Sequence, residues 1–228
     1  MTTLTAPTSP VSDTLAPQRG RTAWAAAGAL AALGGVATML LQGTLNAAYD
    51  SSISGDPEAI AAAMAEVKGH AALFHLAVSL SAVLLLPFGA GLVRRLRRGL
   101  DADSLLPWVA GAGVLLTSAV LILGSGLDTE FGVFPPEPGD VPAEHISFYG
   151  HWIGTIPWLW TGLGATAGCV ALAGVRRVVP RWHAVAGFVL GGATLAFGVS
   201  PMEYMALLPA TLWLLVTGLA FTLGDRRA

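Results

Sequence analysis

The sequence predicts an all-α, polytopic integral membrane protein with six transmembrane helices and both termini in the cytoplasm. Three observations lead to this fold class. Of the 228 residues, 54% are hydrophobic and only 11% are charged, whereas about a quarter of the residues in a soluble domain are charged. The hydrophobic residues form six long runs, and the arginines fall only beside alternate ends of these runs. This composition argues against a disordered chain and against a water-soluble globule.

Each hydrophobic run is long enough, or nearly so, to cross a bilayer as a helix. A hydrocarbon core about 30 Å thick needs roughly 20 apolar residues in a helix. A backbone in lipid must satisfy its hydrogen bonds internally, so we interpret all six runs as α-helices. The predicted spans are about 23–48, 70–93, 105–127, 152–175, 183–200 and 205–223.

Both ends of the chain are predicted to be cytoplasmic tails. Residues 1–22 are polar and rich in Thr, Ser and Pro, as disordered termini often are. Arg19 and Arg21 followed by an apolar run could mimic a signal peptide, but the run exceeds the roughly 7–15 residues of a hydrophobic signal region. We therefore predict an uncleaved first span. The predicted organisation is a tail at 1–22, a transmembrane domain at 23–224 with a long outer loop at 128–150, and a tail at 225–228.

The distribution of charge predicts the orientation. All the arginines lie before the first span, after the sixth, or in the second-to-third and fourth-to-fifth connections. Connections rich in Lys and Arg stay in the cytoplasm, so both termini are predicted to lie inside. Of the 12 Lys and Arg residues all but one are Arg, and Ala and Gly are abundant. This composition suggests a bacterial chain, and the predicted location is the bacterial cytoplasmic (inner) membrane. Trp24, Trp108 and Trp182 start the first, third and fifth spans, where an aromatic belt is expected. No basic patch alternates with aromatic residues, so we exclude nucleic acid as a partner.

Two further patterns concern the arrangement of the helices. The second and fourth spans each open near Gly-His and close on Val-Arg-Arg, which predicts a parallel repeat of helix pairs two-three and four-five. Shared membrane composition is the alternative. Gly164 with Gly168, and Gly187 with Gly191, form GxxxG motifs that let helices approach closely. Packing within one chain is the default interpretation, and a homo-oligomer is the other.

A stripe of polar residues is predicted at the outer end of the first span. Gln42, Asn46 and Asp50 are spaced four apart, which puts them on one face of a helix. Polar residues within a membrane usually face a bundle interior or a cavity. Hydrogen bonds between helices are the simpler explanation of the same pattern.

The outer ends of the spans also carry candidate acid–base residues. Carboxylates partly removed from water have raised pKa values and can act as general acids near neutral pH, and a histidine can relay the proton. The candidate catalytic residues are Asp50, His75, Asp128, Glu130, His151 and Glu203.

The fourth span and the loop before it are predicted to enclose a substrate. The loop at 128–150 contains the stiff Pro-Pro-Glu-Pro-Gly stretch at 135–139, and loops of this length are often functional. Pro157 is expected to kink the helix beside Trp158 and Trp160, which would wall a pocket. Ordinary aromatic packing is the alternative. The candidate substrate-binding residues are Gln42, Asn46, Trp158 and Trp160.

These residues support several functional hypotheses. The leading one is an intramembrane enzyme that acts by acid–base chemistry on a small lipophilic, lipid or isoprenoid-like molecule. A metal- or haem-binding redox subunit is an alternative, although no dense ligand motif occurs and no cofactor is assigned. A transporter or a non-catalytic accessory subunit is the third hypothesis. The inner halves of the spans carry almost no ionisable residues, which favours an outward-facing pocket over a continuous polar path.

Overall fold

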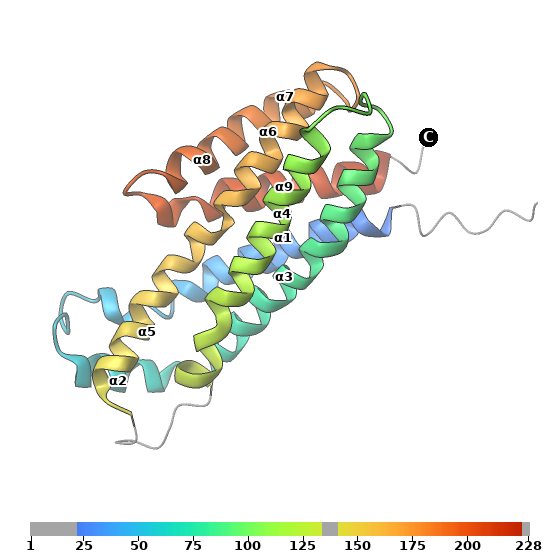
Figure 1. Cartoon of the computed structure of the whole chain (residues 1–228). Helices are drawn as coiled ribbons and strands as arrows, with labels where there is room; N and C mark the ends of the chain where they lie inside the picture. The colour runs from blue at the N-terminus through green and yellow to red at the C-terminus, as the bar shows by residue number, and fades with distance from the viewer. Residues whose placement is uncertain (1–21, 134–140, 225–228) are drawn as a thin grey trace, which may run out of the picture.

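The computed structural model describes residues 22–133 and 141–224, and over these residues the chain is helical with no strand (Figure 1). Its six apolar helical segments confirm the predicted fold class, a multi-pass membrane protein. Five segments are long and apolar enough to cross a membrane, and a sixth is shorter. They are Ala23–Gln42, Lys68–Arg97, Leu106–Val133, Ala143–Val175 and Glu203–Gly224, with the shorter Trp182–Gly198.

Several spans change helix type along their length. The first half of the chain contains α1 (Ala23–Gln42), a 3₁₀ turn (Ala47–Tyr49), α2 (Pro57–Glu66), α3 (Lys68–Arg97) and α4 (Leu106–Gly124), which continues as a 3₁₀ turn (Ser125–Leu127) and a π turn (Asp128–Val133). The second half contains α5 (Ala143–Thr155), a 3₁₀ segment (Ile156–Thr161), α6 (Gly162–Val175), α7 (Trp182–Ala186), a π turn (Gly187–Gly191), α8 (Gly192–Gly198), a 3₁₀ turn (Glu203–Met205) and α9 (Leu207–Gly224).

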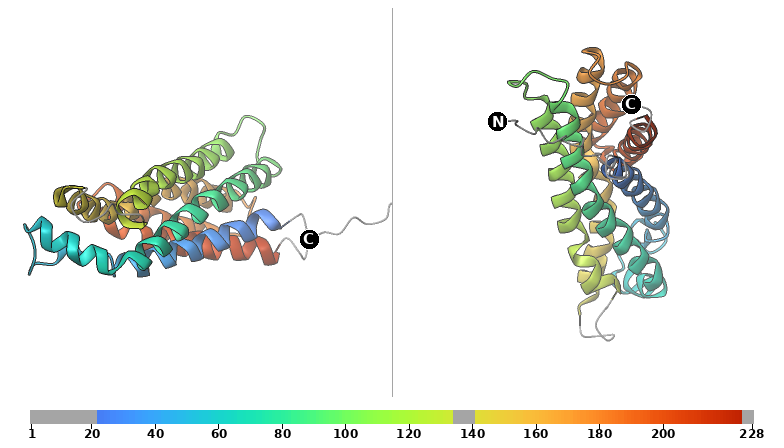
Figure 2. Two further views of the ribbon diagram at one scale, coloured as in Figure 1. Left: turned by 90° about the horizontal axis from the view of Figure 1, so that it is seen from below. Right: turned by 90° about the vertical axis from the view of Figure 1, so that its right-hand side faces the viewer.

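The helices form one elongated bundle whose two ends differ in charge. The start of α1, the end of α9 and the α3–α4 and α6–α7 connections lie together at the upper right in Figure 1. We call this the arginine end, because those connections carry arginines. The segments around α2, the start of α5 and the α8–α9 connection lie toward the opposite end (Figures 1 and 2). We call this the acidic end, because these segments carry Asp56, Glu58, Glu144 and Glu203. The helices therefore alternate in direction as the charge pattern predicts.

The prediction that Gln42, Asn46 and Asp50 share a helix face is wrong, because α1 ends at Gln42 instead of continuing to residue 48. Thr44 donates its hydroxyl hydrogen to the Leu41 carbonyl at 2.7 Å and helps to close the turn. The chain then folds back to bury Leu45 and Ala48. The burial of these two apolar side chains favours this turn over a longer α1 helix.

The predicted long outer loop at 128–150 is also wrong over most of its described length. The third span remains helical to Val133, and α5 begins at Ala143, about nine residues before the predicted start of the fourth span. Phe131 and Tyr149 pack with ring centroids 6.0 Å apart, so apolar contacts hold both extensions against the bundle. The Pro-Pro-Glu-Pro-Gly stretch lies within 134–140, outside the described residues.

One of the three predicted belt tryptophans lies inside the protein. Trp24 is buried, with its ring 5.9 Å from that of Phe88 and 5.4 Å from that of Phe221. It fits there because Gly91 has no side chain, and a Cβ at that position would collide with the indole. Trp108 and Trp182 are 54% and 42% exposed, as a belt residue should be.

The GxxxG motifs pack helices of the same chain against one another. A Cβ placed on Gly191 would lie 2.5 Å from the Ala167 Cβ, and one on Gly187 would lie 2.5 Å from the Ala167 carbonyl oxygen. Gly164 faces the Leu195 side chain in the same way, whereas a Cβ on Gly168 would meet nothing within 4 Å. Three of the four glycines therefore serve contact between α6 and the α7–α8 segment.

Candidate functional site

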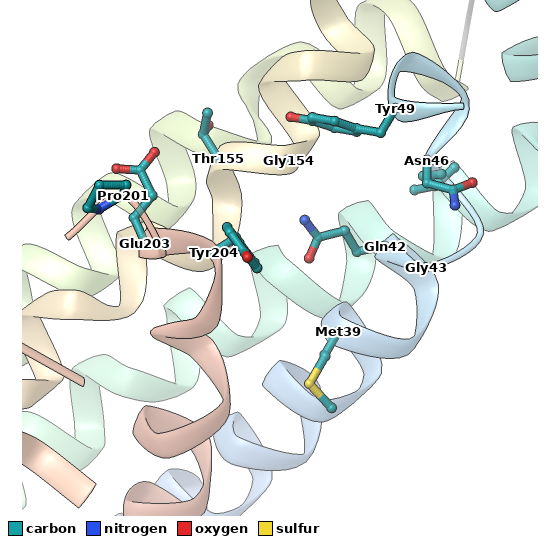
Figure 3. Close-up of a pocket in the computed structure, with 11 residues that line it drawn as sticks. Met39, Gln42, Gly43, Asn46, Tyr49, Gly154, Thr155, Pro201, Glu203 and Tyr204 are labelled. Carbon is teal, nitrogen blue, oxygen red and sulfur yellow. The ribbon is translucent and has the colours of Figure 1, made fainter. Parts of the chain in front are cut away.

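A pocket of about 520 Å³ opens at the acidic end, between the end of α1, the α5–α6 segment and the α8–α9 connection (Figure 3). Its lining combines apolar side chains with amide, hydroxyl, phenol and carboxylate groups. The lining residues are Met39, Gln42, Gly43, Leu45, Asn46, Tyr49, Gly154, Thr155, Pro201, Glu203 and Tyr204. Three sequence-predicted site residues, Gln42, Asn46 and Glu203, are among them.

Two contacts hold the α1 side of the pocket against α5. The Gln42 side-chain amide donates to the Ile153 carbonyl oxygen at 3.4 Å. The Tyr49 hydroxyl donates to the His151 carbonyl oxygen at 3.3 Å, and its ring meets the His151 imidazole edge-on at 5.2 Å. Gly154 leaves room for this phenol, since a Cβ there would overlap the Tyr49 hydroxyl. His151 is thus an exposed residue at the edge of the pocket.

Glu203 and two tyrosines give the pocket its electrostatic character. Figure 3 shows Glu203, Tyr204, Gln42 and Tyr49 arranged around a common space. Partial burial raises the pKa of the Tyr49 phenol above its ordinary value, and the negative charge of Glu203 raises it further. Glu203 therefore lies close enough to Tyr49 for its charge to be felt across the pocket. The same negative charge favours a positively charged or neutral molecule in the pocket.

A second polar cluster joins three helical segments around Asp128, which is fully buried. The Tyr149 hydroxyl donates to Asp128 Oδ1 at 3.1 Å, and His75 Nδ1 lies 3.5 Å from Asp128 Oδ2. Gly132 allows this approach, because a Cβ there would lie 2.5 Å from the Tyr149 hydroxyl oxygen. The structure thus brings together the predicted His75 and Asp128.

The remaining predicted carboxylates lie at the surface. Asp50 is exposed and accepts hydrogen bonds from the Ser52 backbone N–H at 2.8 Å and from the Ser52 hydroxyl at 2.7 Å. These bonds lower the Asp50 pKa, which is the opposite of the raised pKa expected of a general acid. Glu130 is exposed on the π turn beside Asp128. Neither residue is among those that line the pocket.

The two predicted substrate-binding tryptophans are also outside the pocket lining. Trp160 is fully buried and lies against Gly35, where it fills the centre of the bundle. Trp158 is partly exposed and donates its indole N–H to the Gly198 carbonyl oxygen at 2.8 Å. The Pro157 region is a 3₁₀ segment between α5 and α6, so the helix changes type where a kink was predicted.

The residues of the pocket and of the Asp128 cluster that the sequence prediction missed are the tyrosines. The chain contains three, Tyr49, Tyr149 and Tyr204, and each belongs to the pocket or to the Asp128 cluster. Their rarity and their shared position at the acidic end were available signals. In the described part of the chain, no three His, Cys, Asp or Glu side chains gather as a metal centre requires.

Comparison with known proteins gives one weak similarity. No family model matches the sequence, and no solved structure matches the fold. The chain is 29% identical over 129 residues to the p-hydroxybenzoic acid efflux pump subunit AaeB of Yersinia enterocolitica. The match covers 46% of this chain but 20% of the length of that protein. Together with the membrane-spanning helices, it agrees with a location in a bacterial cell membrane.

Proposed function

We propose that this protein is a membrane subunit that binds a small molecule for export, with the pocket at the acidic end as the binding site. The pocket is the observation that carries the proposal, because its size and its mixed lining are typical of small-molecule sites. The similarity to part of an efflux pump subunit supports export over catalysis. The ligand is expected to contact both the apolar Met39 and Leu45 and the polar Gln42 and Asn46.

The charge of the pocket narrows the class of ligand. Among the described lining residues the charged side chain is Glu203, so an anion would meet repulsion there while a cation would gain attraction. Tyr49 and Tyr204 add phenol rings whose faces attract cations. We therefore expect small neutral or cationic amphipathic molecules, and this expectation differs from the aromatic acid in the name of the similar pump.

Export through this chain would need movement of the helices or a partner subunit. Toward the arginine end, the centre of the bundle is filled by buried apolar side chains such as Ala32, Phe88 and Trp213. A ligand held at Gln42 therefore has packed side chains beneath it. An accessory role, in which the pocket supplies or receives ligand at the outer surface, fits this arrangement.

The enzyme hypothesis keeps one supporting observation, the His75–Asp128–Tyr149 cluster. A buried carboxylate with a histidine and a phenol is a plausible proton-transfer group. However, Asp128 is fully buried, so a substrate would have to displace packed side chains to reach it. The open pocket needs no such change, and export is the better supported function.

Binding to purified protein in lipid nanodiscs tests the proposal. A panel of neutral, cationic and anionic aromatic amphiphiles would be titrated by calorimetry. We expect a cationic or neutral member to bind, and Glu203→Gln to weaken the cation by about tenfold, which is about 1.4 kcal/mol. Glu130→Gln is the matched control, since it removes an exposed carboxylate outside the pocket. Equal effects of the two substitutions, or binding of the anions alone, would contradict the proposal.

A cellular measurement tests the export step separately. Cells that lack the gene should accumulate more of the bound compound than cells that carry it. The wild-type gene and the Glu130→Gln gene should restore low accumulation, whereas Glu203→Gln should restore it only in part. If the purified protein binds the compound but its loss leaves accumulation unchanged, the pocket is a binding site and the export role is wrong.

A further inference from the structure

A second hollow, of about 600 Å³, lies at the arginine end between α3 and α4. It is lined by Ala90, Val93, Arg94, Arg97, Arg98 and Trp108. Three guanidinium groups therefore share one concave surface with apolar side chains and one indole. The hollow is at the opposite end of the bundle from the pocket proposed to bind exported molecules, and its interpretation does not depend on that proposal.

The positive charge in this hollow has no acidic partner in the described part of the chain. Arg94, Arg97 and Arg98 are exposed, and none of them has a described carboxylate within ion-pair distance. Asp101 and Asp103 in the α3–α4 connection are not among the lining residues. The Arg97 guanidinium carbon lies 5.0 Å from the centre of the Trp108 ring, a contact that holds the cation over the indole face. Among residues 22–133 and 141–224, an anion that binds here displaces no ion pair of these arginines.

An apolar surface leads from the arginines toward the middle of the membrane. On α3, the exposed residues Val83, Pro87 and Ala90 follow one another at intervals of three or four and continue to Arg94, so they lie on one helix face. On α4, Trp108 is followed at the same spacing by the exposed residues Ala112 and Leu115.

The two helices approach closely beneath this surface. A Cβ on Gly111 would lie 2.6 Å from a Val93 methyl group, and one on Gly89 would lie 3.0 Å from a methyl group of Val114. The exposed apolar rows of α3 and α4 therefore belong to two helices in close contact, and we call the two rows together the apolar strip. Such a strip suits a flexible hydrocarbon chain lying along the outside of the bundle.

We propose that this hollow is a binding site for an anionic phospholipid of the cytoplasmic leaflet. Its phosphate would accept hydrogen bonds from Arg94, Arg97 and Arg98, because guanidinium groups match the geometry of phosphate oxygens. One acyl chain would lie along the apolar strip of α3 and α4. Orientation of the protein needs only positive charge on this side, whereas a lipid site also explains the hollow, the Arg97–Trp108 contact and the adjoining apolar strip.

Native mass spectrometry of the full chain in mild detergent tests this proposal. The probes are phosphatidylglycerol and, as a comparison with no net charge, the zwitterionic phosphatidylcholine. We expect the wild-type protein to retain phosphatidylglycerol. The double variant Arg94→Gln/Arg97→Gln should bind this lipid with an apparent affinity about tenfold weaker. Arg176→Gln/Arg181→Gln is the matched control, because it removes the same charge from the same end, outside the hollow. It should bind phosphatidylglycerol as the wild type does.

Three outcomes would overturn the proposal. Equal retention of the two lipids would show that the site does not select a lipid with a net negative charge. Equal loss in the two double variants would show that total charge acts and the hollow does not. Displacement of phosphatidylglycerol by inorganic phosphate at equal concentration would indicate a site for free phosphate. Trp108→Leu supplies a further test that keeps every arginine, and it should weaken phosphatidylglycerol without changing the weak binding of phosphatidylcholine.

Discussion

Single residues in the Asp128 cluster show how a carboxylate is accommodated inside this bundle. Its Oδ1 accepts the Tyr149 hydroxyl hydrogen at 3.1 Å, and its Oδ2 faces the His75 imidazole. The carboxylate is shielded from solvent, so the Tyr149 hydroxyl replaces part of the hydration that it would have in water. Oδ2 has the His75 Nδ1 at 3.5 Å but no hydrogen bond. Tyr149 is itself fully buried, and its hydroxyl therefore has a structural role that Tyr204, on the surface, does not share.

Removing the Tyr149 hydroxyl tests this role. Tyr149→Phe leaves Asp128 Oδ1 without its donor in a buried site, and we expect a loss of about 1–3 kcal/mol in the free energy of unfolding. The measurement is equilibrium unfolding in mixed micelles. Tyr204→Phe is the control, because Tyr204 is exposed, and it should change stability by less than about 0.5 kcal/mol. Equal stability of the two variants would show that the Tyr149–Asp128 contact contributes nothing.

At the scale of elements, small residues determine which helices meet. Gly187 and Gly191 of the α7–α8 segment lie against Ala167 on α6, and Gly164 lies against Leu195 on α8. Close approach of this kind provides van der Waals contact that lipid cannot supply as well. It also lets the short segment Trp182–Gly198 pack beside longer helices.

Gly191 and Gly168 form a matched pair for testing this packing. Gly191→Ala should destabilise the bundle by about 1–3 kcal/mol, because its new methyl group would overlap the Ala167 Cβ. Gly168→Ala should be neutral or stabilising by up to about 1 kcal/mol, since its methyl group meets open space and alanine favours helix. Both are measured by unfolding in micelles. Destabilisation by Gly168→Ala as large as that by Gly191→Ala would contradict the assignment of the contact.

At the scale of the whole molecule, the two ends have opposite charge, and a different function is proposed for each. The acidic end carries the pocket and the Asp128 cluster, and the arginine end carries the proposed lipid site. The small net charge of −2 conceals this separation. The positive-inside rule accounts for the position of the arginines. The rule does not account for the position of the acidic residues, of which Glu203 lines the pocket and Asp128 belongs to the buried cluster.

Labelling of introduced cysteines tests the predicted orientation. In a Cys169→Ala background, Glu130→Cys lies at the acidic end and Asp103→Cys at the arginine end, and both positions are exposed. A membrane-impermeant maleimide should label Glu130→Cys in intact cells and Asp103→Cys only after permeabilisation. The wild-type chain, with Cys169 buried, should stay unlabelled in both cases. The reverse pattern would show that the termini face outward.

Several residues of the two polar sites could be predicted from the sequence, but the contacts between them could not, because those contacts join residues far apart along the chain. Gln42, Asn46 and Glu203 belong to the pocket, and His75 and Asp128 meet, because polar residues at span ends tend to face protein. Their grouping into two sites could not be predicted. Tyr149 contacts Asp128, which is 21 residues away in the sequence, and Tyr49 contacts His151, which is 102 residues away. A single sequence does not show which helices are neighbours.

The sequence by itself determined the helical membrane fold and the separation of charge between the two ends. The physical reason is that a bilayer imposes span length and apolar composition on each helix separately. The tertiary structure decided where α1 ends, which tryptophans are buried and how the polar residues combine. Those outcomes depend on contacts between distant segments, such as Ala48 against Gly150 and Trp24 against Gly91, whose energies are set only when the helices pack.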